Sequence, residues 1–274
     1  MDLLEALFYG LVQGLTEFLP VSSSAHLRVL PAFLGQEDPG AAFTAVIQLG
    51  TMLAELLFFR HDLVRIARSW LGQFRRPELR GTLDARLGWY LVFATIPISV
   101  LGLAFEDDIE TTARSLTLIG TMLVALALVL LVADRVGRRE RGISELRLRD
   151  GLVMGSAQAL ALVPGVSRSG ATITAGLLLG LDRAAAARFS FLLSIPAVVL
   201  SGLFQLYGVV SGEEATDTSA LALVGATAVA AVSGYAVIAF LLRYLATHSF
   251  TPFVVYRVAL GTLVLVLAAT GAIE

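Results

Sequence analysis

The chain contains no cysteine and no lysine, so all 20 of its basic residues are arginines. The absence of cysteine excludes a disulfide framework, a thiolate metal site and a cysteine nucleophile. The absence of lysine excludes Schiff-base chemistry and the lysine of a nucleotide-binding P-loop. The 274 residues are also poor in charge, since charged residues make up 15% of the chain against about 25% in a typical globular protein.

Apolar residues account for 57% of the chain and gather in long runs. About 20 helical residues, each rising about 1.5 Å, cross the roughly 30 Å hydrocarbon core of a bilayer. We expect six membrane-spanning helices, over residues 41–59, 87–105, 115–133, 184–207, 219–242 and 252–272. The predicted fold is therefore all-α and polytopic, which excludes a purely cytosolic enzyme. The first apolar stretch lacks the positive region of a cleavable signal peptide, so we expect it to belong to the mature fold.

Two further apolar segments, 3–34 and 151–181, are broken before they are long enough to span the bilayer. The first is broken at Pro20 and the three serines that soon follow it, and the second at residues 164–170. Each arm reaches only about 20 Å as a helix. Broken backbone at that depth survives only where it is buried in protein or lines a cavity. We therefore expect two re-entrant helical hairpins.

The distribution of arginines predicts how the chain is threaded through the membrane. Segments 60–86 and 134–150 hold seven and six arginines against three and four acidic residues. Segments 106–114 and 208–218 hold four and three acidic residues, with one arginine in the former and none in the latter. Arginine-rich loops stay in the cytoplasm. This rule places both termini outside, so the first hairpin enters from the outer face and the second from the cytoplasmic face.

Weak internal similarity supports an inverted arrangement of two halves. Residues 10–17 align with 151–158, and residues 21–25 align with 166–170. Further matches keep the same order, at offsets of 141 to 146 residues. Each match is weak by itself in so apolar a chain, and their common order and offset indicate a repeat.

We therefore predict a single membrane domain over residues 1–274. It consists of repeat 1 at about 1–134, a cytoplasmic linker at about 135–149, and repeat 2 at about 150–274. Inverted repeats with broken helices place their site near the bilayer midplane, where the hairpin tips meet.

The two predicted tips carry polar residues that would converge on one cavity. At the start of the second helical arm of each hairpin lie Ser22, Ser23 and Ser24 in the first hairpin, and Ser167, Arg168 and Ser169 in the second. Two helix N-termini with free N–H groups would face the cavity and bind an anion, such as a substrate phosphate. Arg168 adds a planar guanidinium that suits phosphate oxygens, and Thr172, four residues later, can add a hydroxyl on the same helix face.

Three more residues near the first tip are candidates for chemistry. Gln13 and Glu17 lie four residues apart, on one face of a helix, and their oxygens suit a divalent cation such as Mg²⁺ or Ca²⁺. His26 lies four residues after Ser22, close to the tip, where it can transfer a proton. Ionisable residues inside the membrane are costly, so each is a functional candidate.

Each candidate also has a structural interpretation. The serines can cap helix ends, and Arg168 can pair with Glu17 and lock the hairpins together. His26 can be a buried, hydrogen-bonded imidazole, and Gln13 can join helices through its amide. Their common location at two converging tips favours the functional interpretation.

Ionisable residues elsewhere favour a structural role. Glu55 is expected near the cytoplasmic end of its span, where it can pair with Arg60 or reach the interface. The arginines of 60–86 adjoin membrane spans and lack an aromatic stacking platform. They predict a face for lipid headgroups and not a nucleic-acid site.

Residues 13–26 (QGLTEFLPVSSSAH) and 164–172 (PGVSRSGAT) together resemble the two signature stretches of the bacterial undecaprenyl-diphosphate phosphatase family. Residues 47–50 and 189–196 resemble that family as well, and the layout is similar along nearly the whole chain. The resemblance implies an integral plasma-membrane enzyme that hydrolyses undecaprenyl diphosphate to the monophosphate and phosphate. It also implies recycling of the lipid carrier of cell-wall synthesis, a divalent metal ion, and a site open to the outer face.

Position by position, the resemblance points to Gln13, Glu17, Ser23, His26, Ser167, Arg168 and Thr172. The sequence departs from the family pattern in three places. Gln13 stands where many members have Glu, Ser24 and Ala25 replace a common Thr-Gly, and Thr44 occupies a position often held by Glu. The first and third departures leave one carboxylate fewer around the metal.

The physical interpretation of the tips is compatible with phosphoryl transfer, which chiefly needs neutralised phosphate oxygens and a positioned nucleophile. Arg168, the two helix N-termini and a cation at Glu17 would neutralise charge, and His26 would act as general acid or base. Attack by Ser23 and activation of a water by Glu17 or His26 both stay open, with serine attack favoured.

A secondary transporter or lipid flippase is the alternative function, because paired re-entrant hairpins in an inverted repeat also occur in transporters. The expected partners are a polyprenyl diphosphate lipid and the membrane, with a homodimer as an option and no nucleic acid. Phosphate release by purified protein distinguishes the enzyme from the transporter.

Overall fold

The computed structural model describes residues 1–105, 115–211 and 218–273. Within these ranges every regular element is a helix, and one isolated bridge joins Arg141 to Leu181. The predicted all-α class is confirmed.

Six long helices correspond to the six predicted spans. They are α3 (Gly40–Phe58), α5 (Leu83–Ala104), α7 (Leu116–Val136), α10 (Arg183–Ser211), α11 (Ala220–Tyr244) and α12 (Thr251–Ala269). Five of them, all except α3, are each long and apolar enough to cross a membrane. The helix α3 meets that criterion only together with α4 (Arg60–Gly72), from which it is bent by 70°. The described chain therefore has five candidate spans, or six if this bent pair counts as one.

The two segments predicted as hairpins form pairs of shorter helices. The first pair is α1 (Leu3–Glu17) and α2 (Ser23–Leu34), and the second is α8 (Leu148–Ala159) and α9 (Arg168–Leu178), with the short helix η3 (Leu160–Leu162) between. The helix α2 has 12 residues, which is about 18 Å and too short to span the bilayer alone. Two other short helices, η1 (Pro77–Leu79) and η2 (Ile143–Glu145), lie in connections.

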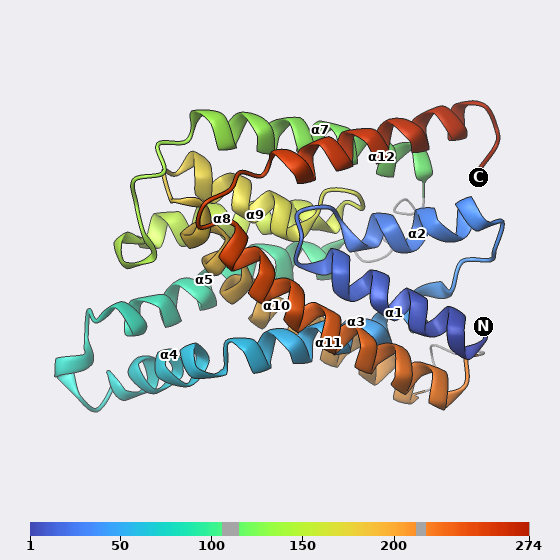
Figure 1. Cartoon of the computed structure of the whole chain (residues 1–274). Coiled ribbons are helices and arrows are strands. Elements are labelled where there is room, and N and C mark those ends of the chain that lie inside the picture. The colour runs from blue at the N-terminus through green and yellow to red at the C-terminus, as the bar shows by residue number, and fades with distance from the viewer. Residues whose placement is uncertain (106–114, 212–217, 274) are drawn as a thin grey trace.

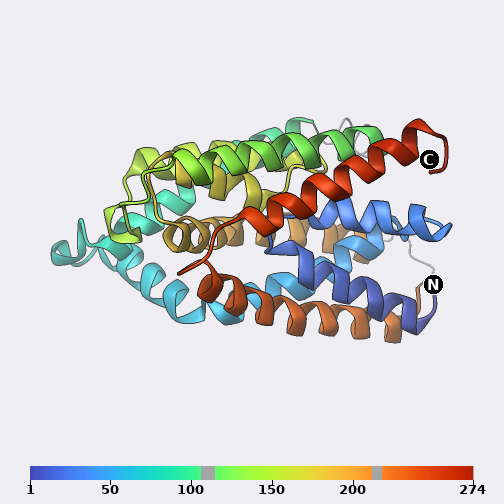
Figure 2. The same ribbon diagram turned by 45° about the horizontal axis from the view of Figure 1, so that its top comes forward.

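The chain ends lie together at one end of the helical bundle. Figures 1 and 2 both show this, and they place the connections from α4 to α5 and from α7 to α8 at the opposite end. The two helix breaks lie between these ends (Figure 1). The acidic segment 106–114, and residues 212–217 of segment 208–218, lie outside the described residues.

Small residues bring α1 directly onto the backbone of α11. A Cβ added to Gly10 would lie 2.2 Å from the carbonyl oxygen of Ala226, and one added to Gly14 would lie 2.0 Å from Oγ of Ser233. Such spacing of glycines permits close helix approach in membranes. The packing fixes the position along the bundle of Glu17, the last residue of α1.

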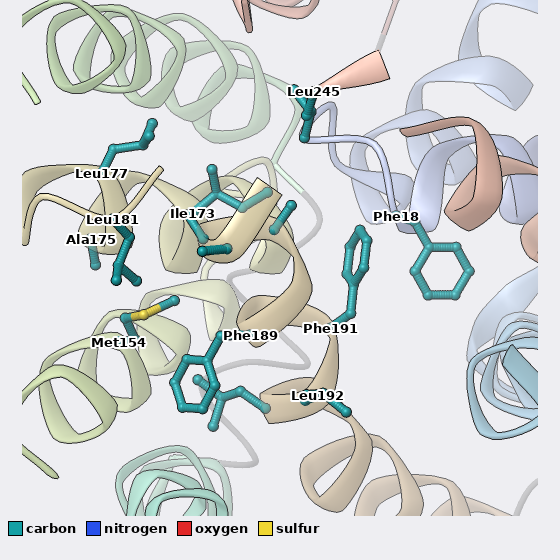
Figure 3. Close-up of a cluster of buried hydrophobic side chains, with 14 of the residues drawn as sticks. Phe18, Met154, Ile173, Ala175, Leu177, Leu181, Phe189, Phe191, Leu192 and Leu245 are labelled. Carbon is teal, nitrogen blue, oxygen red and sulfur yellow. The ribbon is translucent and has the colours of Figure 1, made fainter. Parts of the chain in front are cut away.

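An apolar core holds the end of α1 against α10. Phe18, which directly follows Glu17, packs edge-to-face on Phe191 with ring centroids 5.6 Å apart. Figure 3 shows this pair beside the cluster that includes Met154, Ile173 and other buried residues of α8, α9 and α10. The first helix break is therefore seated on the same core as the second hairpin.

Ion pairs fasten the connection between α7 and α8. Arg141 contacts Asp150 at 2.5 Å, and Arg183 contacts Asp134 at 2.6 Å. The hydrogen bond that Arg141 donates to the Asp150 carboxylate raises the pKa of the Arg141 guanidinium above its ordinary value. Arg141 therefore stays charged, and its pairing with Asp150 persists at neutral pH.

Candidate active site

Two helix breaks with the same local geometry supply the backbone of the site. Ser22 precedes α2 and Ser167 precedes α9, and their φ angles are 73° and 71°. Their Oγ atoms accept the N–H groups of Ala25 and Gly170 at 3.4 and 3.1 Å. A non-glycine residue in this conformation costs about 1–3 kcal/mol and occurs mostly at functional sites. Both serines cap their helices, as their structural interpretation predicted.

An ion pair joins the two breaks. Arg168, the first residue of α9, contacts Glu17, the last residue of α1. The two side chains are 18% and 9% exposed. Beside them, the hydroxyl of Ser169 donates to the carbonyl of Leu19 at 3.1 Å. The predicted convergence of the two tips is confirmed. The pair itself is the contact that the structural interpretation of Arg168 described as an alternative to phosphate binding.

Glu17 is the centre of the polar contacts at this junction. Its Oε1 accepts from Arg168, and its Oε2 accepts from Oγ of Ser23 at 2.5 Å and from Nε2 of Gln13 at 3.1 Å. The same amide nitrogen of Gln13 also donates to Thr51 on α3 at 3.4 Å. The carboxylate is thus held in one orientation, with one oxygen placed to take the proton of the Ser23 hydroxyl.

His26 lies at the same break but faces a different neighbour. Its Nδ1 is 2.7 Å from the carbonyl oxygen of Ser22, and its Nε2 is 2.6 Å from the hydroxyl of Tyr256 on α12. A carbonyl only accepts, so Nδ1 carries the proton, and Nε2 of the neutral ring accepts from Tyr256. Both ring nitrogens are therefore engaged away from Ser23.

A cavity of about 550 Å³ opens beside the ion pair. The polar residues from the two breaks that line it are Glu17, Ser22, Ser23, Ser24, Ser167 and Arg168. Apolar side chains from α5, η3 and α10 line most of the rest, among them Ile98, Leu103, Leu162 and Leu200. Three polar side chains outside the two breaks complete the lining: Gln48 of α3, Ser99 of α5 and Ser201 of α10. A cavity with one polar end and mostly apolar walls suits an amphiphile that has an anionic headgroup.

Four predicted site residues lie behind the cavity wall and not on it: Gln13, His26, Ser169 and Thr172. Thr172 is fully buried, and its hydroxyl is 2.5 Å from that of Ser190 on α10 and donates to the carbonyl of Arg168 at 2.8 Å. Thr172 thus fastens α9 to α10 directly under Arg168. Gln13 does not line the cavity, but it donates a hydrogen bond to Glu17, which does.

The structure adds Arg257 of α12, which the sequence interpretation missed. This arginine is fully buried, and all its acceptors are backbone carbonyls. They belong to Pro20, Met122, Leu123, Gly165 and Val166, at distances of 2.9 to 3.4 Å. One guanidinium therefore binds both helix breaks and α7. A lone arginine inside an apolar run of membrane length was the available signal.

Replacing Arg257 is expected to destabilise the fold strongly. Arg257→Leu leaves several buried carbonyls without donors, and we expect the free energy of unfolding to fall by at least about 3 kcal/mol. Arg257→Lys keeps the charge but not the planar fork, so it should restore only part of the loss. Unfolding in detergent micelles measures both, with Arg243→Leu, at an exposed arginine of α11, as the control. If Arg243→Leu lowered the free energy of unfolding equally, the structural role assigned to Arg257 would be contradicted.

Glu55 does not pair with Arg60, so that expectation is wrong. The carboxylate is fully buried and accepts from the hydroxyl of Ser194 on α10 at 2.6 Å. Arg60 is exposed and donates to the carbonyl of Leu57 at 2.8 Å. The reason is the 70° bend between α3 and α4, which carries Arg60 away from the face of α3 that holds Glu55.

Glu17 and Gln13 are the predicted cation ligands. Among the described residues, no three His, Asp or Glu side chains gather in a group that could hold a metal ion. Glu17 offers one carboxylate, with the Gln13 amide and the Ser23 hydroxyl in contact with it. Mg²⁺ is commonly held by one or two carboxylates together with substrate phosphate oxygens and water. The donor set therefore fits a cation that is shared with a bound phosphate.

Residues 6–263 match the family model described as Bacitracin resistance protein BacA. The chain belongs to this family. The family match and the apolar helices of the fold together show that the chain is a multi-pass membrane protein. The resemblance carried by residues 13–26 and 164–172 is thereby confirmed.

Relatives of this BacA-family chain carry the name undecaprenyl-diphosphatase. The protein from Nocardioides sp. is 56% identical, over 100% of this chain and 99% of the relative. The protein from Kineococcus radiotolerans is 55% identical, over 100% and 96% of the two chains. The protein from Myxococcus xanthus is 52% identical, over 99% and 91%. The similarity therefore extends through both helix breaks and the helices that support them.

Proposed function

We propose that this BacA-family protein hydrolyses undecaprenyl diphosphate to undecaprenyl phosphate and inorganic phosphate, and so recycles the lipid carrier of cell-wall synthesis. The shared name of full-length relatives at 52–56% identity supports this activity. The observation that carries the proposal is the junction of Arg168, Glu17 and Ser23 on the wall of one cavity.

The walls of the cavity support a lipid diphosphate as the substrate. A diphosphate is an anion, and Arg168 and the N-termini of α2 and α9 provide positive potential at the polar end. A prenyl chain is apolar, and side chains of α5 and α10, such as Ile98 and Leu200, provide an apolar wall next to that end. One molecule can therefore satisfy both parts of the cavity.

In the proposed reaction, Oγ of Ser23 attacks the terminal phosphorus while Oε2 of Glu17, 2.5 Å away, takes the hydroxyl proton. The bond from that phosphorus to the bridging oxygen breaks, and undecaprenyl phosphate leaves with the bonding electrons. A water then cleaves the phosphoserine and releases phosphate. Arg168 stabilises the charge on the transferring group. His26 holds the Ser22 carbonyl and thereby the start of α2.

A divalent cation, Mg²⁺ or Ca²⁺, is part of the proposal. Glu17, which lines the cavity, would hold it together with the diphosphate, and Gln13, the other predicted ligand, would support it through the hydrogen bond that it donates to Glu17. When bound, the cation supplies further neutralisation of phosphate charge.

We further propose that the helix pairs α1–α2 and α8–α9 are re-entrant hairpins of an inverted repeat in the plasma membrane. The matching geometry of Ser22 and Ser167 supports the repeat. The arginine-rich connections at the end opposite the termini support a cytoplasmic location for that end, with the site open to the outer face. Homodimer formation stays a prediction.

The decisive assay incubates the purified protein in detergent with a polyprenyl diphosphate and measures released phosphate, with and without a chelator. We expect release that the chelator abolishes and that added Mg²⁺ or Ca²⁺ restores. Phosphate release that is unchanged by the chelator would contradict the requirement for a divalent cation but not the phosphatase activity. No release, together with ion-coupled lipid flux in sealed vesicles, would contradict the enzyme and favour the transporter.

A further inference from the structure

The helix α4 lies toward the end of the bundle opposite the chain termini (Figure 1). A second hollow opens on this helix. Its volume is about 540 Å³, and it is lined by Arg60, His61, Val64, Arg65, Arg68 and Ser69. These residues follow one another at helical spacing, so they form one stripe along α4. None of them lines the active-site cavity. The hollow is therefore a separate feature.

The charges of this hollow are only partly balanced by acidic residues. Arg65 binds Asp84 through Nε and Asp62 through Nη2, each at 2.9 Å, and Arg188 of α10 contacts the other oxygen of Asp62 at 2.5 Å. Two arginines and two aspartates thus compensate one another. This cluster fixes α4 against α5 and α10.

The remaining arginines of the hollow carry a surplus of positive charge. Arg60 is exposed and donates to the carbonyl of Leu57, and no acidic side chain among the described residues pairs with it. Arg68 is exposed and has no acidic partner within the part of the chain that the structure describes. The hydroxyl of Ser69 and the imidazole of His61 lie beside them in the same hollow. These groups are suited to the oxygens of a phosphate.

The apolar residues near the hollow are typical of a membrane interface. Val64 of the hollow is 46% exposed, Leu71 further along α4 is 58% exposed, and Phe74, which follows the helix, is 61% exposed. Trp70 of α4 packs edge-to-face on Trp89 of α5, with ring centroids 5.4 Å apart. Aromatic side chains mark the level of lipid headgroups, and helices with a basic face and exposed apolar residues lie in that layer.

We propose that the α4 hollow binds the phosphodiester of an anionic phospholipid from the leaflet at the arginine-rich end of the bundle. Arg60 and Arg68 contact the phosphate oxygens, and the acyl chains lie along the exposed apolar residues of α4. Charge complementarity selects an anionic lipid over a zwitterionic one. The proposal does not depend on hydrolysis, because the two cavities share no residue.

The test is native mass spectrometry of the detergent-solubilised full chain, titrated with phosphatidylglycerol or with phosphatidylcholine. The wild type is expected to retain phosphatidylglycerol preferentially. Arg60→Gln combined with Arg68→Gln is expected to bind it about 30-fold more weakly, the effect of losing two arginines at a membrane surface. Excess inorganic phosphate should not displace the lipid, because the acyl chains contribute to binding.

A matched control removes two arginines elsewhere at the arginine-rich end. Arg138, in the connection between α7 and α8, and Arg149, in the first turn of α8, are both exposed, and changing both to Gln removes the same net charge. This control should keep wild-type lipid binding and thereby separate a local site from overall charge. An equal loss in the control, no lipid preference in the wild type, or displacement by phosphate would each overturn the proposal.

Discussion

Arg168→Ala is expected to lower the turnover of a polyprenyl diphosphate by about 10³-fold or more, the scale of losing an arginine that stabilises a transferring phosphoryl group. Arg168 is the only guanidinium lining the active-site cavity among the described residues, and it lies at the N-terminus of α9. The measurement is phosphate release by the purified variant over a range of substrate concentrations. The loss should fall mainly on kcat, because the interaction strengthens in the transition state.

Two controls separate this role from the ion pair with Glu17. Arg168→Ala also leaves the Glu17 carboxylate without its ion-pair partner, so Arg168→Lys, which keeps a positive charge beside Glu17 but loses the planar fork, tests whether the lost pairing alone causes the loss. We expect Arg168→Lys to stay well below wild-type turnover. Arg243→Ala, at an exposed residue of α11, should keep wild-type turnover. A folded Arg168→Ala protein with near-normal turnover would refute the assigned role.

Ser23→Ala is expected to lower turnover by at least about 10⁴-fold, because it removes the nucleophile itself. The geometry supports this expectation, since the Ser23 hydroxyl lines the cavity and donates to Glu17. Ser24→Ala is the matched control. Ser24 lines the same cavity but bonds to Ser22 and not to Glu17, so its loss should cost no more than about 100-fold.

Acid quenching distinguishes serine attack from attack by water. With a substrate labelled in the terminal phosphate, the wild type should retain label on Ser23, and Ser23→Ala should retain none. Substantial turnover by Ser23→Ala would instead indicate a water activated by Glu17. Glu17→Gln should impair both routes, since the same carboxylate takes the proton in each.

The sequence predicts the helices well because lipid restricts the chain to apolar helices of a certain length. The expected span 252–272 appears as α12, and 115–133 appears as α7, each within a few residues. The break at residues 164–170 is equally visible, since Pro164 and Gly165 interrupt an apolar run. The convergence of the two breaks follows from the predicted inverted arrangement, and the contact of Arg168 with Glu17 agrees with it.

Contacts between distant side chains could not be predicted in the same way. The direction of His26 depends on Tyr256, which lies 230 residues further along the chain. Segment 60–86 was expected as an arginine-rich loop, but its first half forms α4 because Ile66 and Asp62 are buried against the bundle. The direction of His26 does not follow from local pattern, because the fold brings Tyr256 beside it. The amphipathic pattern of residues 60–72, by contrast, was a local signal for α4.

Arg257 restricts how the molecule can move. An alternating-access cycle requires the two halves to rock against each other, and α12 would have to exchange the carbonyl partners at Pro20 and Gly165 on every stroke. Because one guanidinium binds both helix breaks, we expect the active-site cavity to keep its shape when the lipid binds. Undecaprenyl phosphate and inorganic phosphate would then leave by diffusion through an opening that does not change during the reaction.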